Sequence, residues 1–299
     1  MLKENILETI GNTPIIKLNR IKEELGLKGN LYAKIEFYSP GLSKKDRIAK
    51  YIIEKALKEE KIKKNQIVIE RTSGNTGIGC AAVCALYGIP FIAVMSEGNT
   101  VERRKIIEMF NGKVHLVPKI SKGEGVTQED MDLVQSEYER LLHELDAFPV
   151  NQFYNEDNAL AHYYTTAQEI INDVPNVDTF VDLVGTGGSF VGIAKRLKEY
   201  NKDIKCIKVS PDKINHNIQG GGYFVDIPFE EDGLCDDTIY VSTQEAIDGM
   251  NMLSTKESIL GGISSGANLI AALKYLEKHT DSNIVFLIND VGLKYLSII

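Results

Sequence analysis

Apolar residues follow two alternating periods along the whole chain. Short runs rich in β-branched residues predict strands at 31–37, 67–70, 90–95, 114–118, 178–185, 204–210 and 283–288. Between these runs, three- and four-residue apolar spacing predicts helices near 43–59, 75–87, 100–111, 126–144, 157–173, 188–200, 243–254 and 265–278. This alternation predicts an α/β fold, in which mostly parallel sheets are covered by helices.

Length and polar segments add to this outline. A chain of 299 residues is long for one compact core and sufficient for two lobes. The polar segments 120–130 and 229–237 predict surface loops, and no internal repeat or low-complexity tract interrupts the alternation.

The charge balance narrows the class of function. A net charge of −8 argues against a nucleic-acid or anionic-membrane surface and favours a protein that acts on small molecules. No apolar run reaches the roughly 20 residues of a membrane span, and the N-terminal MLKENILETIGNTP lacks the apolar segment of a signal peptide.

Cysteine and histidine spacing predicts neither disulfides nor a metal site. Cys80, Cys84, Cys206 and Cys235 form no C-x-x-C pair, and two of them lie in one apolar helical run. We therefore expect reduced, buried thiols and a cytoplasmic protein. The five histidines are scattered without zinc-ligand spacing.

The stretch SPGLSKKDRIAKYI (39–52) opens a helix with two adjacent lysines. At helical spacing Lys45 shares a face with apolar positions, namely Ile48, Ala49, Ile52 and Ala56. Lys44 instead lines up with polar ones, namely Arg47, Tyr51, Glu54 and Lys58. The pattern predicts that Lys44 is solvated and dispensable, that Lys45 begins the buried stripe, and that Ser43 and Asp46 cap the helix.

A buried lysine is a candidate nucleophile, because burial lowers its pKa and frees the amine. Position alone leaves an alternative open, in which Lys45 extends to solvent or pairs with an acid.

The segment VGTGGSFVG (184–192) follows a predicted strand and opens a predicted helix. Backbone N–H groups of such a loop bind anions, and Thr186 and Ser189 add hydroxyls. Phe190 replaces the third glycine of a dinucleotide-binding fingerprint, and no Walker Lys-Ser/Thr follows the glycines. The loop predicts a binding site for one phosphate, with a plain tight turn as the alternative.

Two further loops resemble it in position. ERTSGNTGIG (70–79) brings together hydroxyls and an amide that suit a carboxylate or a phenolic oxygen, or that only cap a helix. GGISSGANL (261–269) offers Ser264 or Ser265 to a ligand or as a cap. Loops at the carboxyl ends of parallel strands meet in one crevice, so a phosphate site, an oxyanion site and a buried lysine together fit pyridoxal phosphate held by the lysine.

The motifs then resemble a known family almost from end to end. They are IGNTPIIKL, SPGLSKKDRIA, TSGNTGIG, VERRKII, NQFYNEDNALAHYYTTAQEI, GTGGS and GISSGA. They resemble the cysteine synthase and cystathionine β-synthase family of fold-type II pyridoxal-phosphate enzymes. The resemblance implies a two-lobed, tryptophan-synthase-β-like fold and a homodimer. It implies a small mobile lobe at 41–156 and a large cofactor-binding lobe from 1–40 plus 157–299.

The same resemblance implies roles for the site residues. Lys45 would form the Schiff base with the cofactor, and Asn75 would bond the cofactor's phenolic oxygen. Substrate carboxylate would be held by Thr72, Ser73, Thr76 and Gln152. Cofactor phosphate would be held by Gly185, Thr186, Gly187, Gly188 and Ser189. Ser264 would meet the pyridine nitrogen, and a serine there leaves the ring a weak electron sink, which favours loss of a leaving group from Cβ.

The implied reaction is β-replacement on a small amino acid. Lys45 would remove the substrate Cα proton, a bound aminoacrylate would form, and a nucleophile would add at Cβ. The chain departs from the usual cysteine synthase pattern at 39–43, 96–100, 219–237 and 289–297, which concerns the substrate pair more than the cofactor.

The acidic segment FEEDGLCDD (229–237) is the most informative departure. Sulfide needs no carboxylate partner, whereas a second amino acid carries an ammonium group that Asp232 could bind, with Glu230 and Glu231 as weaker candidates; the alternative is a solvated acidic turn. The hypothesis is that hydrosulfide leaves L-cysteine and a second L-cysteine adds to form L-lanthionine, by resemblance to the hydrogen-sulfide-producing, lanthionine-forming branch.

Three alternatives stay open. One is a conventional cysteine synthase that joins an activated serine to sulfide. Another is a synthase that joins an activated serine to another amino acid. The third, of a different class, is a catalytically inactive relative that serves as a binding partner.

Overall fold

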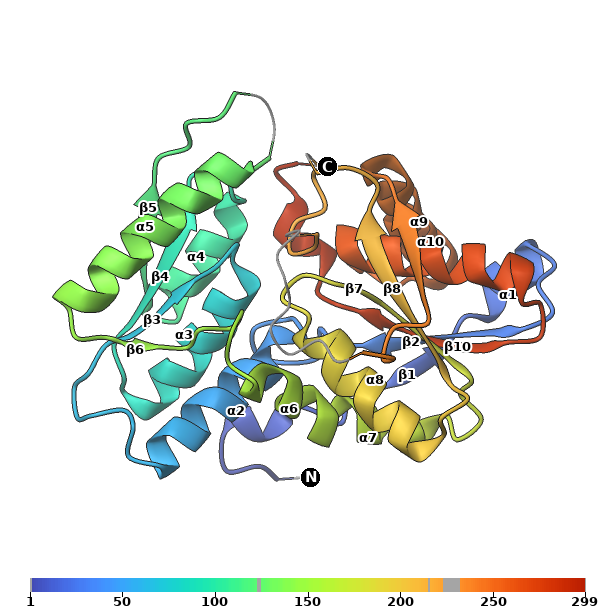
Figure 1. The fold of residues 1–299 in the computed structure, drawn as a ribbon, viewed down its shortest axis with the longest axis horizontal. Coiled ribbons are helices and arrows are strands. Elements are labelled where there is room, and N and C mark those ends of the chain that lie inside the picture. Colours follow the sequence, from blue (N-terminus) through green and yellow to red (C-terminus); the bar gives the residue numbers. More distant parts are fainter. Residues whose placement is uncertain (1, 123–124, 215, 223–231, 299) are drawn as a thin grey trace.

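Two separate sheets organise the chain, as the computed structural model shows for residues 2–122, 125–214, 216–222 and 232–298 (Figure 1). The six-stranded sheet has the order β1-β2-β10-β7-β8-β9, and only β1 runs antiparallel to its neighbour. Its strands are β1 (Ile15–Lys17), β2 (Asn30–Ile35), β7 (Thr179–Leu183), β8 (Lys205–Pro211), β9 (Asp237–Val241) and β10 (Asn283–Ile288).

The four-stranded sheet is wholly parallel, in the order β5-β4-β3-β6. Its strands are β3 (Val68–Arg71), β4 (Phe91–Ser96), β5 (Lys113–Val117) and β6 (Phe148–Pro149). Parallel strands are connected by helical crossovers, which explains why apolar strand runs alternate with amphipathic helices along the sequence.

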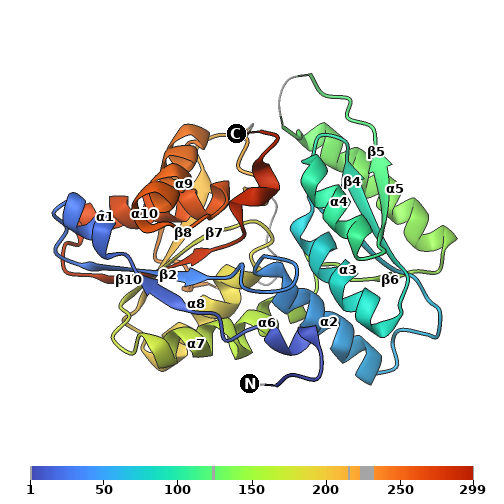
Figure 2. The same ribbon diagram turned by 180° about the vertical axis from the view of Figure 1, so that it is seen from behind.

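Helices cover both faces of each sheet (Figures 1 and 2). On the large sheet, one face packs against α9 (Thr243–Glu257) and α10 (Ile263–Lys278), and the other against α7 (Thr166–Asp173) and α8 (Gly188–Tyr200). On the small sheet, α3 (Asn75–Tyr87) and α4 (Val101–Met109) lie opposite α5 (Gln128–Glu144). The short α1 (Asn19–Glu24) packs beside α9.

The two halves meet through helices and through the C-terminus. Helix α2 (Lys45–Lys58) packs on α3 of the small half and on α6 (Asp157–Tyr164), which in turn packs on α8 of the large half. The 3-10 turn η2 (Gly292–Tyr295) contacts α4, and the Ser297 N–H donates to Glu102 Oε1 at 2.8 Å. The other 3-10 turn is η1 (Ile6–Thr9).

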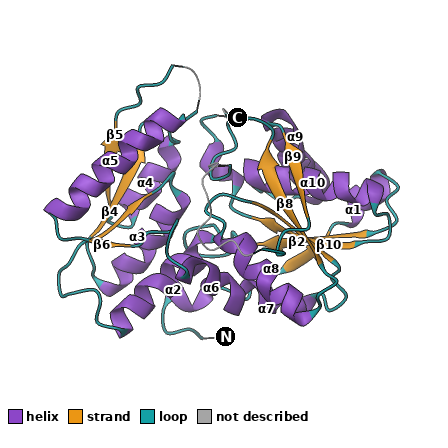
Figure 3. Cartoon of the chain, in the orientation of Figure 1, coloured by secondary structure: helices purple, strands orange, loops and turns teal. Residues whose placement is uncertain are grey.

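Most predicted elements match the secondary structure (Figure 3). Each predicted strand and helix is present, although the helix expected over 157–173 breaks at Thr165 into α6 and α7. The pattern missed β1, β6, β9 and α1, which are two to six residues long. The mostly parallel, helix-covered α/β fold is confirmed, whereas the lobe boundaries and the mobility of 41–156 remain predictions.

Several sequence expectations concern membranes, metals and thiols. Over the described residues, no helix is both long and apolar enough to cross a bilayer. Within the same residues, no group of three or more His, Cys, Asp or Glu side chains could hold a metal ion. All four cysteines are free, and every one except the half-exposed Cys235 is buried.

Candidate active site

An inner cavity of about 510 Å³ lies where the loops of the two halves meet. Lys44 and Lys45, at the start of α2, form one wall. The remaining lining residues are Ser73, Asn75, Thr76, Gln152, Leu183, Thr186, Gln219, Gly220, Ser264 and Asn289. The structure thus brings together candidates from segments that lie far apart in the sequence.

Lys45 is the first residue of α2, and its amine reaches toward the glycine-rich loop. Its Nζ lies 3.4 Å from Thr186 Oγ1. Burial, together with the charge of the neighbouring Lys44, lowers the pKa of the Lys45 amine to about 7. Near neutral pH a large fraction of this amine is therefore uncharged and nucleophilic.

Lys44 is buried, and the prediction that it is solvated is wrong. Its Nζ lies 3.0 Å from both carboxylate oxygens of Asp182 and 2.8 Å from Ser189 Oγ. Lys44 directly precedes α2 and its backbone is already helical, so its spacing relative to the helix does not explain the error. Its partners come from β7 and α8, which helical periodicity cannot reveal.

Two other expectations for α2 have mixed outcomes. Ser43 Oγ accepts the N–H of Lys45 at 3.4 Å, as expected of a capping residue, but Asp46 accepts the Gly41 N–H at 2.7 Å and does not complete a capping box. Arg47, expected on the solvated stripe, is buried in ion pairs with Glu36 at 2.6 Å and Glu169 at 2.7 Å. The apolar stripe itself is confirmed as buried at Ile48, Ala49, Ile52 and Ala56.

The glycine-rich loop turns directly into α8, and α6 holds it in place. Gly187 has φ 88°, a conformation that favours glycine, and a Cβ on Gly188 would lie 2.0 Å from Asn158 Oδ1. The Asn158 amide donates to Thr186 Oγ1 at 2.9 Å and to the Gln152 carbonyl at 2.7 Å. The loop therefore presents the N-terminus of α8, where backbone N–H groups favour an anion.

The Ser189 hydroxyl bonds to protein partners and does not donate to an anion at this loop. It donates to Asp182 Oδ2 at 2.5 Å and accepts from Lys44. With its proton committed to a carboxylate, Ser189 can offer a phosphate only its backbone N–H.

The loop 72–76 opens α3 with its hydroxyls partly used locally. Thr72 Oγ1 accepts the Gly74 N–H at 2.9 Å. This agrees with the alternative in which the loop residues cap the helix. Thr76 Oγ1 donates to Gln152 Oε1 at 2.6 Å, and Gln152 Nε2 donates to the Arg71 carbonyl at 3.1 Å. Thr76 and Gln152 therefore form one connected unit that faces the cavity.

Asn75 and Ser264 lie on the same cavity, each with a partner from the C-terminal segment. Asn75 Nδ2 donates to Asp290 Oδ2 at 2.7 Å, and Ser264 Oγ accepts from Asn289 Nδ2 at 3.2 Å. The serine hydroxyl keeps its own proton available, which suits an unprotonated pyridine nitrogen.

The residues fit pyridoxal phosphate. A lysine amine with lowered pKa, a helix N-terminus that suits a phosphate, an amide and a serine hydroxyl all line or border one cavity. Apart from Lys44 and Lys45, the described lining carries no ionisable side chain.

Comparison with known proteins agrees with this fit. The family model described as pyridoxal-phosphate dependent enzyme matches residues 6–290. Cysteine synthase B of Campylobacter jejuni is 38% identical over 98% of this chain and 97% of its own length. The chain belongs to the pyridoxal-phosphate enzymes of the cysteine synthase and cystathionine β-synthase family.

Solved structures of family members superpose over nearly the whole chain. A hydrogen sulfide-producing enzyme from Fusobacterium nucleatum is 39% identical with a TM-score of 0.91, covering 98% of this chain and 100% of its own. An O-acetylserine dependent cystathionine β-synthase from Helicobacter pylori is 31% identical with a TM-score of 0.92, covering 99% and 98%. The chain is thus a fold-type II enzyme of β-replacement and elimination, with pyridoxal phosphate as cofactor.

This cysteine synthase-like enzyme has site residues that the motifs did not single out. Buried Lys294 donates to Asn75 Oδ1 at 2.8 Å, and burial lowers the pKa of its amine to about 8. Asp290 accepts from Asn75 and from Tyr295 Oη, the latter at 2.9 Å. The one available signal was the departure of 289–297 from the usual family pattern, because isolated polar residues after the last strand have no periodicity.

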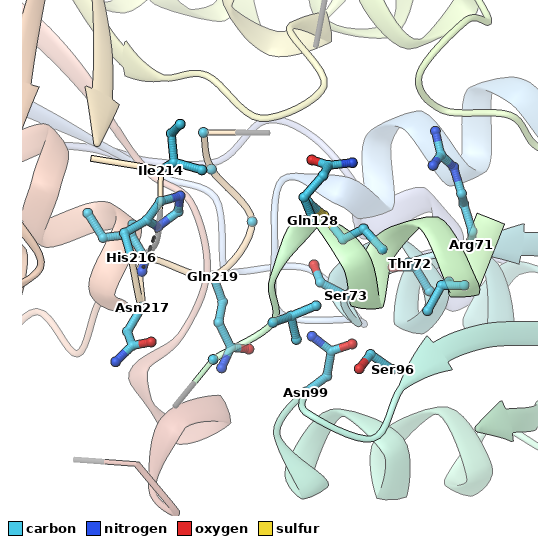
Figure 4. A pocket seen from close by; sticks show the side chains of 18 of the residues that line it. Arg71, Thr72, Ser73, Ser96, Asn99, Gln128, Ile214, His216, Asn217 and Gln219 are labelled. Carbon is cyan, nitrogen blue, oxygen red and sulfur yellow. Dashed lines mark hydrogen bonds between the residues drawn. The ribbon is translucent and has the colours of Figure 1, made fainter. Parts of the chain in front are cut away.

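A second, outer cavity of about 970 Å³ adjoins the inner one and opens to solvent. The two share Ser73, Gln152, Gln219 and Gly220. Side chains of 214 and 216–219 line one side, and residues from the small half, including Arg71, Asn99 and Gln128, line the other (Figure 4).

Asp232 is exposed and does not occur among the described residues that line either cavity. It follows the segment 223–231, which begins directly after the outer-cavity residue Gly222. Glu230 and Glu231 lie outside the described residues. A role for Asp232 therefore remains a prediction.

Proposed function

We propose that this enzyme carries out β-replacement on L-cysteine. Hydrosulfide leaves Cβ, and the sulfur of a second L-cysteine adds there, so that two cysteines give one L-lanthionine and one hydrogen sulfide. The likeness to the hydrogen sulfide-producing enzyme of Fusobacterium nucleatum carries the proposal, because it extends over nearly the whole of both chains at 39% identity.

The chain's own residues suit the first half of this reaction. Thr72, Ser73, Thr76 and Gln152 hold the carboxylate of the first cysteine at the start of α3, where helix N–H groups add positive potential. Bound pyridoxal phosphate supplies the electron sink for negative charge at Cα. The uncharged form of the Lys45 amine, abundant near neutral pH because its pKa is about 7, takes the Cα proton onto its Nζ.

The second half needs room for another amino acid. The outer cavity supplies that room. It adjoins the inner cavity, and four residues line both. In the proposal Asp232 binds the ammonium group of the second cysteine. Asp232→Asn should then raise the KM for the second cysteine while single-turnover sulfide release from the first continues; unchanged kinetics for both steps would rule out the role.

Conventional cysteine synthesis is the close alternative, because the Campylobacter jejuni relative is named cysteine synthase B. Supplying the purified enzyme with L-cysteine alone separates the two. Steady sulfide release with lanthionine supports the proposal, whereas turnover only with O-acetylserine and sulfide supports the alternative. A synthase that joins O-acetylserine to another amino acid would instead require that second amino acid.

Assembly and location remain predictions from the resemblance and the cysteine pattern. Light scattering coupled to size-exclusion chromatography should report about twice the 33.3 kDa chain mass if the enzyme is a homodimer. Cell fractionation would test the expected cytoplasmic location.

A further inference from the structure

The outer cavity carries an unusual charge distribution for a surface of this acidic protein. Its described lining contains no aspartate or glutamate. Arg71 and His216 are its ionisable side chains there. Burial lowers the pKa of His216, which leaves that imidazole neutral at pH 7. Over the described lining, the fixed charge at neutral pH is therefore the positive charge of Arg71.

Within the described part of the chain, the Arg71 guanidinium makes no ion pair and packs on the ring of Phe153, whose centroid lies 4.3 Å from Arg71 Cζ. The charge of Arg71 also acts on the buried carboxyl of Glu70, the preceding residue of β3: burial raises the pKa of that carboxyl, and the Arg71 charge acts to lower it. Most other guanidinium groups of the chain, such as that of Arg47, are ion-paired. An arginine held against a ring keeps its N–H edge free and pre-oriented, and that edge matches a carboxylate in a bidentate arrangement.

The position of Arg71 relates it to the reaction. It ends β3 and directly precedes the loop 72–76, which is assigned to the first substrate's carboxylate. Its carbonyl accepts from Gln152, one of the residues shared by both cavities. In Figure 4 the Arg71 guanidinium and the Gln128 amide lie at the end of the cavity away from Ser96 and Asn99. Because Gln128 is exposed, this end faces solvent.

We propose that Arg71 is a specificity residue of the outer cavity and binds the carboxylate of the incoming thiol nucleophile. This inference rests on the proposed thioether-forming function and names its acceptor class, namely carboxylate-bearing thiols. Arg71 would then bind the carboxylate of the second amino acid, and Asp232 would bind its ammonium group.

The test uses O-acetylserine as first substrate and simple thiols as nucleophiles. In each turnover the Cβ–O bond breaks, a Cβ–S bond forms, and the thiol proton leaves with acetate as acetic acid. The nucleophiles are 3-mercaptopropionate, which has only the carboxylate, cysteamine, which has only the ammonium, and 2-mercaptoethanol, which has neither. Each variant is compared with the wild type on the same thiol, which cancels differences in thiol reactivity.

Arg71→Gln should raise the KM for 3-mercaptopropionate by about 10- to 100-fold, the effect of losing one charge-assisted contact. The KM values for 2-mercaptoethanol and O-acetylserine should stay within about twofold, because neither uses the guanidinium. Arg71→Lys should recover part of the loss. Arg140→Gln, which removes an exposed arginine on α5, serves as the matched control.

Calorimetric titration of 3-mercaptopropionate into the holoenzyme needs no turnover and should show the same loss of affinity in Arg71→Gln. Equal KM increases for all three thiols, an increase confined to O-acetylserine, or unchanged calorimetric affinity would each overturn the assignment. A wild-type enzyme that releases no sulfide from cysteine would instead contradict the proposed function. The measurements on Arg71 would still be interpretable, because none of them uses cysteine.

Discussion

Lys44 and Lys45 are adjacent in sequence but have opposite electrostatic surroundings. Lys44 is fixed by Asp182, which is 0% exposed, whereas Lys45 has a hydroxyl as its hydrogen-bond partner. This arrangement favours the uncharged form of Lys45, because the Lys44 charge adds to the effect of burial in lowering the pKa of Lys45. Lys44 is thus a positioning residue rather than a dispensable surface lysine.

Replacing Lys44 should be costly. Lys44→Met leaves the Asp182 carboxylate buried without its cation, so we expect a loss of about 3–5 kcal/mol in the free energy of urea unfolding. Lys58→Met, on the exposed end of the same helix, should change it by less than about 0.5 kcal/mol. The double variant Lys44→Met/Asp182→Asn should recover part of the loss; a single variant as stable as Lys58→Met would contradict the buried pair.

The lowered pKa of Lys45 predicts how cofactor uptake depends on pH. Only the uncharged amine reacts with the cofactor aldehyde, so the rate at which apoenzyme gains its cofactor absorbance band should rise through a pKa of about 7 and level off above it. A rate that rises only toward 10.5, the ordinary lysine pKa, would show that the amine is not perturbed.

At this scale the sequence predicted residues that belong to motifs or to a helical stripe. Lys45, Asn75, Thr186 and Ser264 all line the inner cavity as the motifs suggested. Lys44 was misplaced because its partner Asp182 lies 138 positions away, a pairing that local spacing cannot reveal. Lys294 and Asp290 were missed for a similar reason, since their contacts with Asn75 form only after the chain closes.

Among the elements, helices α9 and α10 pack against each other unusually closely, through glycines. A Cβ on Gly249 would lie 2.3 Å from the Gly266 carbonyl oxygen, and one on Gly266 would lie 2.0 Å from the Ala246 carbonyl oxygen. In both cases the added Cβ would meet a backbone atom of the facing helix, which cannot move away by rotating a side chain. The packing positions α10, which begins at Ile263 and carries Ser264 in its first turn.

Gly249→Ala should therefore destabilise the enzyme by about 1–3 kcal/mol, although alanine is the better helix former by about 1 kcal/mol. Thermal unfolding should show the lower midpoint. Asp248→Ala, at the neighbouring exposed position of α9, should leave the midpoint within about 2 °C. A Gly249→Ala variant that is more stable than wild type would contradict the close packing.

Element prediction from the sequence succeeded where apolar periods are long. Helix α3, fully apolar over most of its length, and α5, with its clear stripe, match their predicted ranges within two residues. The strands β1 and β6 are three and two residues long, too short to establish an alternating pattern. The break at Thr165 has no proline or glycine signal, so a continuous helix was expected there.

Across the whole molecule, a buried ion cluster connects α2 to the large half. Arg47 pairs with Glu36 and Glu169, and Lys34 Nζ lies 2.7 Å from Glu169 Oε2. Burial acts to raise the pKa of Glu169, but the hydrogen bonds and charge of Arg47, together with Lys34, lower it to about 2. Its ordinary value is 4.5, so its stabilising contribution is complete above that pH and is lost as pH falls toward 2.

Glu169→Gln tests this cluster. We expect a loss of about 3 kcal/mol in unfolding free energy at pH 7, because the variant leaves buried Lys34 without its carboxylate and leaves Arg47 paired with Glu36 alone. The gap between variant and wild type should narrow as the pH falls below 4.5, where the wild-type contribution is also lost. A gap that stays constant down to pH 3 would show that the carboxylate charge does not stabilise the fold.

In the proposed reaction, one active site takes two cysteines, loses one hydrosulfide and makes one thioether. The most direct measurement gives purified holoenzyme an equal mixture of unlabelled and uniformly ¹³C-labelled L-cysteine as sole substrate, and analyses the products by mass spectrometry with parallel sulfide detection. The proposed reaction should give lanthionine in unlabelled, half-labelled and fully labelled forms at about 1:2:1, with one sulfide per lanthionine, and neither product from Lys45→Ala. Sulfide with pyruvate and no lanthionine, or no sulfide at all, would contradict it.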